Sequence, residues 1–142
     1  CSTKTIVKNK SIILIDDSLV RGTTCHKIVK MLYESGAKEV HVRIACPEIR
    51  YPDFYGVDMP TKEELLAYEK NNKEMCDYIN AKSLKFLSLG GLYNALIREK
   101  RNDTYPQFCD HYFTGDYPIK PQDNLNGIKV KQLSLLSGKS NN

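Results

Sequence analysis

The segment that most constrains the fold is a run of four aliphatic residues, Ile12–Ile15, that ends in two adjacent aspartates. This unbroken β-prone run predicts a fully buried strand. From Thr24 apolar residues recur at helical spacing, and Gly36 predicts the end of that helix. Val40–Cys46 predicts a second strand, ended by Pro47. Together these segments predict a βαβ unit, and therefore a parallel sheet with a right-handed crossover.

Capping patterns predict the next two helices. Residues 47–60 are rich in proline, glycine and tyrosine and predict a loop. Thr61-Lys-Glu-Glu64 has the pattern of a capping box and predicts a helix through Tyr68. Asn71-Asn-Lys-Glu74 has a similar pattern and predicts another helix through Ile79.

The rest of the chain completes an α/β fold. Ser83–Leu89 predicts a third strand, and Gly90-Gly91 leads into a further helix. From Asn102 onward the pattern predicts turns, and residues 138–142 are predicted to be disordered. We therefore expect a parallel sheet with flanking helices.

Composition and charge exclude several classes of protein. The 142 residues are one domain's worth of protein with ordinary hydrophobic content. The net charge of +4 comes from three lysines within residues 1–10 and three within 126–142, and the middle is slightly acidic. Basic ends on such a body do not form the massed basic face of a nucleic-acid binder. The longest aliphatic run is far short of the ~20 residues that cross a bilayer, and no signal peptide is evident. We expect a cytoplasmic protein that binds neither nucleic acid nor membrane.

The cysteines do not suggest a metal or disulfide framework. They are odd in number, widely spaced and form no Cys-x-x-Cys pair, at positions Cys1, Cys25, Cys46, Cys76 and Cys109. Zinc and disulfide scaffolds need paired, regular spacing. We expect buried thiols in a reducing compartment.

The turn after the first predicted strand has the chemistry of a phosphate site. Ligands of parallel sheets bind beyond the carboxyl ends of the strands. The amino terminus of the following helix offers unpaired N–H groups and a positive dipole end. Gly22 allows the backbone to approach an anion closely, and Thr23 and Thr24 can add hydroxyl donors or cap the helix.

Asp16 and Asp17 narrow the ligand further, because two carboxylates would repel a plain phosphate. They suit ribose hydroxyls, which can donate to them, and Mg²⁺, which prefers oxygen ligands. A sugar with a phosphate at one end and a magnesium-bound pyrophosphate at the other meets both demands. The alternative is that Asp-Asp-Ser is only a helix entry.

This loop, Ile12 through Thr24, resembles the phosphoribosyl-pyrophosphate (PRPP) loop of type I phosphoribosyltransferases. The form Asp-Asp-Ser-Leu-Val-Arg-Gly-Thr-Thr is similar to that of the amidophosphoribosyltransferases, also called glutamine PRPP amidotransferases. Three later segments share the resemblance, which spans residues 3–120: Glu39–Ile44, Pro47–Thr61 and Phe113–Pro118. The implied fold is part of a type I phosphoribosyltransferase domain, in residues 1–125, followed by a basic, flexible tail in residues 126–142.

The resemblance implies the first step of purine (IMP) synthesis, in which glutamine-derived ammonia reacts with PRPP to give phosphoribosylamine and pyrophosphate. It implies Mg²⁺ as cofactor, purine nucleotides as inhibitors and a homo-oligomeric parent enzyme. Asp16 and Asp17 would contact the ribose and the metal shell, and Val20 to Thr24 would wrap the 5′-phosphate. The Arg21 side chain could lend charge there or face solvent. The full set of PRPP-binding residues is Asp16, Asp17, Ser18, Val20, Arg21, Gly22, Thr23 and Thr24. We assign no general base, because this chemistry is mostly positioning and charge stabilisation.

The sequence departs from the family in length. The glutaminase domain and the first part of the transferase domain, which come before the loop in the family, are not in this sequence. Cys1 is followed by Ser2-Thr3 instead of the Gly-Ile that follows the family's nucleophilic cysteine. We therefore expect Cys1 to mark a truncation point and the isolated chain to have little or no turnover. An exposed sheet edge, prone to association, is expected to result.

A second departure concerns iron. Some family members hold a 4Fe–4S cluster, and Asp53 and Tyr112 stand here where two of the cysteine ligands would be. A cluster needs about four thiolates, and Cys109 alone cannot supply them. We predict no cluster, and we expect His111 to be a structural or surface residue. Four polar residues of the Pro47–Pro60 loop are candidate contacts near the active site without assigned roles: Glu48, Arg50, Tyr55 and Asp58.

Two alternative functions remain at this stage. A non-catalytic regulator could bind PRPP or a nucleotide with the same fold, although such a role would not require Pro47–Thr61 or Phe113–Pro118. An ordinary purine-base phosphoribosyltransferase would carry a different base-recognition segment after the loop.

Overall fold

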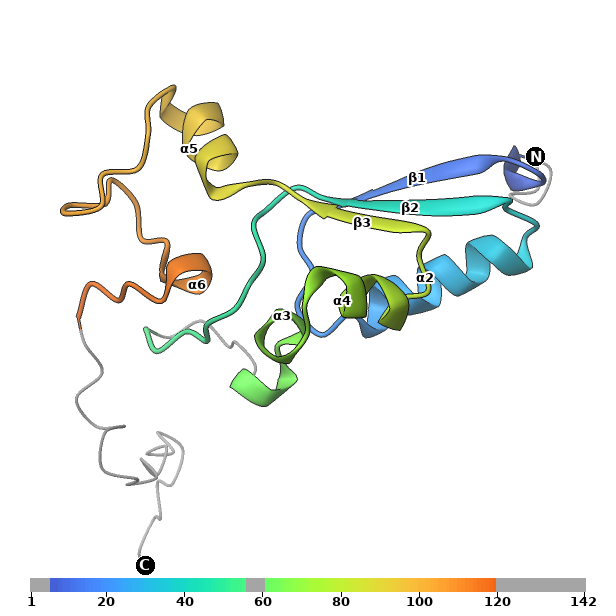
Figure 1. Cartoon of the computed structure of the whole chain (residues 1–142), viewed down its shortest axis with the longest axis horizontal. Coiled ribbons are helices and arrows are strands. Elements are labelled where there is room, and N and C mark those ends of the chain that lie inside the picture. The colour runs from blue at the N-terminus through green and yellow to red at the C-terminus, as the bar shows by residue number, and fades with distance from the viewer. Residues whose placement is uncertain (1–5, 56–60, 120–142) are drawn as a thin grey trace, which may run out of the picture.

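A computed structural model describes residues 6–55 and 61–119, in which three parallel strands form one sheet in the order β1-β2-β3 (Figure 1). The strands are β1 (Ser11–Asp16), β2 (Glu39–Ile44) and β3 (Ser83–Phe86). Helix α2 (Thr23–Glu34) connects β1 to β2, so the predicted βαβ unit is confirmed. The predicted boundary at residue 125, the tail at 126–142 and the disorder at 138–142 lie outside the described residues.

The end of α2 is set by Gly36. Its φ of +92° is a left-handed conformation that side chains with a Cβ rarely adopt. The N–H groups of Gly36 and Ala37 donate to the carbonyls of Tyr33 and Leu32, at 2.8 and 3.1 Å. These bonds satisfy carbonyls that the helix end would otherwise leave unpaired, as in a Schellman motif.

The helices α2, α3 and α4 lie on one face of the sheet (Figure 1). Val40, Val42 and Ile44 of β2 are buried on that face, and Ile12 and Leu14 of β1 pack against the same core.

The prediction that Ile12–Ile15 is fully buried is wrong. The side chains of Ile13 and Ile15 are 65% and 73% exposed, because the described helices cover only one face of the sheet. Strands β1 and β3 are its two edges within the described residues.

The helix predicted from Thr61 through Tyr68 is broken in two. A 3-10 turn, η1 (Lys62–Glu64), is followed by Leu65 in extended conformation and then by α3 (Leu66–Glu69). Thr61 makes no side-chain capping bond, and the Glu64 carboxylate binds Arg21 instead.

The second capping box is confirmed at the start of α4 (Asn72–Tyr78). The Asn71 N–H donates to the Glu74 carboxylate at 2.8 Å, and the Glu74 N–H donates to the Asn71 side chain at 3.0 Å. The reciprocal bonds satisfy two of the donors that the first turn leaves unpaired.

Strand β3 ends three residues earlier than predicted, and β2 ends two residues earlier. The cause at β3 is Ser88, whose hydroxyl accepts from the Gly91 N–H at 3.0 Å and begins α5 (Leu89–Ile97). A short helix, α6 (His111–Thr114), lies in the region where only turns were predicted.

The four described cysteines are free thiols in different environments. Cys25 is buried, Cys46 and Cys76 are partly buried, and Cys109 is exposed. The prediction of buried thiols is therefore wrong for Cys109, and Cys1 lies outside the described residues. Within the described parts of the chain, no helix is long and apolar enough to span a membrane.

One buried ionic cluster joins α5 to α6. The Arg101 guanidinium, whose side chain is 14% exposed, pairs with Asp110 at 2.7 Å and with Asp116 at 2.8 Å. The Tyr93 hydroxyl also donates to Asp110, at 2.8 Å. Burial alone would raise the pKa of Asp110, but the bonds from Arg101 and Tyr93 outweigh it and lower the pKa.

Replacing Arg101 with methionine should lower the free energy of unfolding by about 3–5 kcal/mol, because it leaves the buried Asp110 carboxylate without its cation. The lowered pKa of Asp110 means that this contribution is complete above about pH 4, the unfolded pKa, and is lost as the pH falls through the folded pKa. Urea unfolding followed by circular dichroism, at neutral and acid pH, measures both effects.

Lys30→Met is the matched control. Lys30 forms an exposed pair with Glu34 at 3.9 Å, so its loss should cost less than about 0.5 kcal/mol. Equal destabilisation by both methionine variants would contradict the role assigned to the cluster.

Candidate functional site

The loop between β1 and α2 encloses a cavity of about 490 Å³, lined by the unbroken run of residues 16–25. The loop runs from the end of β1 to the start of α2 (Figure 1). All eight residues predicted to bind PRPP line this one cavity, and the prediction missed two further lining residues, Leu19 and Cys25. Leu19 is buried in the core, which anchors the middle of the loop.

The two aspartates are held by local hydrogen bonds. Asp16 Oδ1 accepts from the Asp17 N–H at 3.0 Å, and Asp17 Oδ1 accepts from the Ser18 N–H at 2.7 Å. The Asp16 carbonyl accepts from the Ala45 N–H at 2.9 Å, which fixes the end of β1 against the residue that follows β2. These side-chain bonds use Oδ1, which leaves the Oδ2 atoms of Asp16 and Asp17 for a ligand.

Gly22 is the residue that makes the loop possible. It precedes α2 with φ +75°, in the left-handed region that favours glycine. A Cβ there would lie 2.7 Å from Leu66 Cδ2 and 3.1 Å from Tyr78 Cε1. No side chain caps α2, so the first N–H groups of the helix, from Thr23 onward, face the loop without an intrahelical acceptor.

Arg21 is directed toward Glu64. Its guanidinium donates to the Glu64 carboxylate at 2.8 Å, and the two side chains are 58% and 49% exposed. The ion pair with Glu64 sets the direction of the Arg21 side chain. An exposed pair of this kind contributes little to stability.

The thiol of Cys25 is not a nucleophile at neutral pH. Burial, and to a smaller extent the charge of Asp16, raises its pKa to about 11. Burial also raises the pKa of the Cys46 thiol, and the charge of Asp17 adds to the effect. Both thiols therefore stay protonated, and the loop offers binding groups only.

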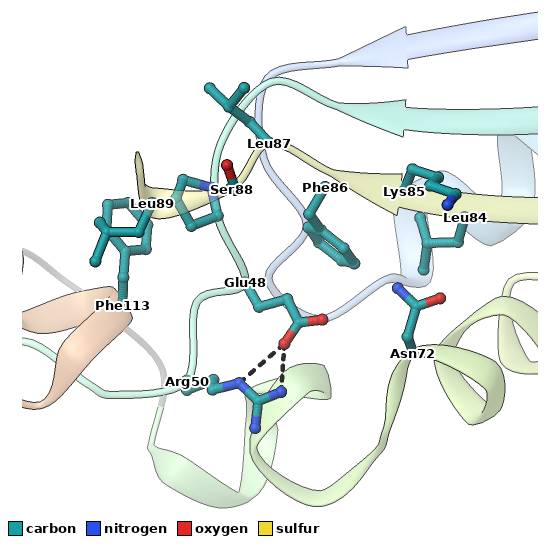
Figure 2. A pocket seen from close by; sticks show the side chains of 11 residues that line it. Glu48, Arg50, Asn72, Leu84, Lys85, Phe86, Leu87, Ser88, Leu89 and Phe113 are labelled. Carbon is teal, nitrogen blue, oxygen red and sulfur yellow. Dashed lines mark hydrogen bonds and ion pairs between the residues drawn. The ribbon is translucent and has the colours of Figure 1, made fainter. Parts of the chain in front are cut away.

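A second cavity, of about 460 Å³, lies beside the carboxyl end of β3 (Figure 2). Glu48 and Arg50 line it and form an ion pair there, with Arg50 Nε 2.9 Å from Glu48 Oε2. Asn72 and Phe113 also line the cavity. Two of the candidate polar residues of the Pro47–Pro60 loop thus line one cavity.

Tyr55 does not line that cavity. The Tyr55 hydroxyl donates to the Ile119 carbonyl at 2.7 Å, and its ring contacts His111 edge-on at 5.2 Å. Asp58 lies outside the described residues.

Asp53 and His111 form a buried pair that the sequence did not reveal. Their side chains are 1% and 2% exposed, and His111 Nε2 lies 2.8 Å from Asp53 Oδ1. Tyr112 also bonds to Asp53, and burial and the Asp53 charge raise the pKa of this tyrosine. No local signal could have found the pair, because 58 positions separate its members.

These residues do not fit a 4Fe–4S cluster. Asp53 is occupied by an imidazole and a phenol, and among the described cysteines only Cys109 contacts the pair. Within the described residues, no three His, Cys, Asp or Glu side chains form a group that could hold a metal ion.

This chain is similar to known amidophosphoribosyltransferases. No family model matches it. The amidophosphoribosyltransferase of Rhizobium etli is 49% identical over 137 residues, which are 96% of this chain and 28% of that protein. The amidophosphoribosyltransferase of Staphylococcus aureus is 50% identical over 117 residues, 82% of this chain and 24% of that protein.

A solved structure supports the same relationship. The glutamine PRPP amidotransferase from B. subtilis, complexed with ADP and GMP, is 44% identical with a TM-score of 0.73, over 82% of this chain and 26% of that chain. The resemblance inferred from the loop and the type I phosphoribosyltransferase fold are both confirmed. The chain spans about a quarter of the length of these relatives, and it is a homologue of that one segment of the amidophosphoribosyltransferases.

Proposed function

We propose that the chain carries the PRPP-binding loop of an amidophosphoribosyltransferase, which transfers glutamine-derived ammonia to PRPP and releases pyrophosphate. The observation that carries the proposal is the 490 Å³ cavity formed by residues 16–25 at the carboxyl end of β1. The 49% identity to the Rhizobium etli enzyme over nearly the whole chain supports it.

The 5′-phosphate would bind at the start of α2. Helix amino termini bind anions because their N–H groups are unpaired and the helix dipole is positive there. Gly22, with φ +75°, lets the backbone turn from Val20 and Arg21 into α2 while packing closely against Leu66 and Tyr78. Thr23 and Thr24 are exposed at the same end and can donate their hydroxyls.

Asp16 and Asp17 would bind the ribose and a magnesium ion. Ribose hydroxyls can donate to the free carboxylate oxygens, and Ser18 holds the Asp17 carboxylate in place. Mg²⁺ is usually bound by one or two carboxylates together with substrate phosphates, so two aspartates without further protein ligands fit it. When bound, the ion would neutralise charge on the leaving pyrophosphate.

The proposed activity belongs to the whole protein, of which this chain is about a quarter of the length. The glutaminase domain and the pyrophosphate side of the site would come from the remaining segments, and we propose that residues 1–142 alone bind PRPP without turnover. We assign no general base and no 4Fe–4S cluster. Because the relative from B. subtilis was complexed with ADP and GMP, we propose that purine nucleotides regulate the parent enzyme, a cytoplasmic homo-oligomer.

Replacing both Asp16 and Asp17 with asparagine should weaken binding of magnesium PRPP at least about tenfold, since each charge-assisted hydrogen bond contributes about 1.5–3 kcal/mol. Isothermal titration calorimetry of the chain with PRPP, with and without magnesium, measures the change.

The matched control is Asp77→Asn, an exposed aspartate on α4. It should leave the affinity unchanged. Unchanged binding in the Asp16 and Asp17 double variant would remove the ribose-and-metal role.

Gly22→Ala should abolish phosphate binding and lower the free energy of unfolding. The new Cβ would lie 2.7 Å from Leu66 Cδ2, and the φ of +75° costs a residue with a side chain about 1–2 kcal/mol. Gly90→Ala is the control, because that glycine lies in α5 with no atom within 4 Å of its added Cβ. Thermal melts with and without inorganic phosphate compare the two, and equal behaviour would contradict the proposed phosphate site.

A further inference from the structure

Cys109, His111 and Asp53 form a connected line of three side chains outside the PRPP loop. The Cys109 Sγ lies 3.2 Å from His111 Nδ1, and His111 Nε2 lies 2.8 Å from Asp53 Oδ1. The imidazole and the carboxylate are almost completely buried, whereas the cysteine is exposed. A nucleophile beside a base that a third group orients is the arrangement of activated thiols.

The chemistry of the partners fixes the proton positions. An ionised carboxylate can only accept, so the Asp53–His111 bond requires the proton on Nε2. The neutral imidazole then presents the Nδ1 lone pair to the thiol of Cys109, and the S–H donates to it. Transfer of that proton gives a thiolate beside an imidazolium, which the Asp53 carboxylate stabilises.

The groups around the pair keep the imidazole in place. The rings of Tyr55, Tyr112 and Tyr117 lie with their centroids 5.2, 4.0 and 5.0 Å from that of His111. Tyr112 also bonds to Asp53, and burial raises the pKa of Tyr112 and Tyr117, so both stay neutral. Among the described residues, Asp53 is the carboxylate that contacts the imidazole.

The thiol opens onto a cavity of about 420 Å³. Two carboxylates, Asp103 and Asp116, line it together with neutral side chains. Both carboxylates form ion pairs with Arg101, which does not itself line the cavity. A cavity lined by carboxylates favours uncharged reactants over anions.

We propose that Cys109 is a modification site that reacts as a thiolate with hydroperoxides, small uncharged oxidants that can enter this cavity. The sulfur attacks one peroxide oxygen, so an S–O bond forms and the O–O bond breaks. The cysteine is oxidised to a sulfenic acid, and the second peroxide oxygen departs as hydroxide or, from an organic hydroperoxide, as an alkoxide. This leaving group takes the proton from His111 and is released as water or an alcohol.

The test measures each cysteine of the whole chain by mass spectrometry. Alkylation by uncharged iodoacetamide between pH 5.5 and 9 should show the rate at Cys109 rising at lower pH than that of an ordinary thiol, which reaches half its full rate near about pH 8.5. Hydrogen peroxide with dimedone at pH 6.5 should label Cys109 at least about tenfold faster than Cys25 or Cys46, whose raised pKa values keep them protonated.

Two variants separate activation from simple exposure. Asp53→Asn keeps a hydrogen-bond acceptor for His111 but removes the charge, and it should move the Cys109 rate profile toward higher pH. Asp116→Asn leaves the contact between Cys109 and His111 in place, so it should not change the pH profile of Cys109 alkylation. It removes a negative charge from the cavity, so the rate with anionic iodoacetate should rise relative to that with iodoacetamide.

Three results would overturn the proposal. One is an alkylation rate of Cys109 that depends on pH as in an ordinary thiol. This result comes from the unaltered chain, so it does not depend on whether a variant folds. Another is the absence of a dimedone adduct at Cys109, and the third is an unchanged profile in a folded Asp53→Asn chain.

Discussion

The parallel pairing of β1 with β2 is the constraint on which the candidate site depends. The strands pair in register from Ser11 with Glu39 to Asp16 with Ile44. The Ala45 N–H extends the ladder to the Asp16 carbonyl, so the last residue of β1 is held where the loop begins. Because the crossover is a helix, the same pairing also fixes where α2 starts. A carboxylate pair and a helix amino terminus therefore face one cavity.

The loop is also tied to residues far along the chain. The Val20 carbonyl accepts from the Leu66 N–H at 2.9 Å, and Gly22 packs against Leu66 and Tyr78. The Arg21–Glu64 pair adds a third contact from the same turn. Segment 61–78 supplies none of the residues that line the cavity of the loop, yet it determines the space available at Gly22. The shape of the loop is consequently a property of the βαβ unit together with the helices that cover it.

The sequence was sufficient to predict the elements whose structure depends on residues close to one another along the chain. The βαβ unit, the Gly36 helix end and the Asn71 capping box depend on periodicity and on bonds within a few residues, and all were predictable. It failed where distant residues compete for a group. Glu64 completes no capping box because Arg21, 43 positions away, binds its carboxylate. The exposure of Ile13 depends on which elements cover the second face of the sheet, and the residues of β1 do not indicate this.

The Pro47–Tyr55 segment and α6 are joined by a buried hydrogen bond between Asp53 and His111. A buried carboxylate is tolerable only when it is paired, so Asp53 and His111 depend on each other. The bond uses Nε2 of the imidazole, which leaves Nδ1 toward Cys109. The same geometry that stabilises the junction therefore underlies the reactivity that we propose for Cys109.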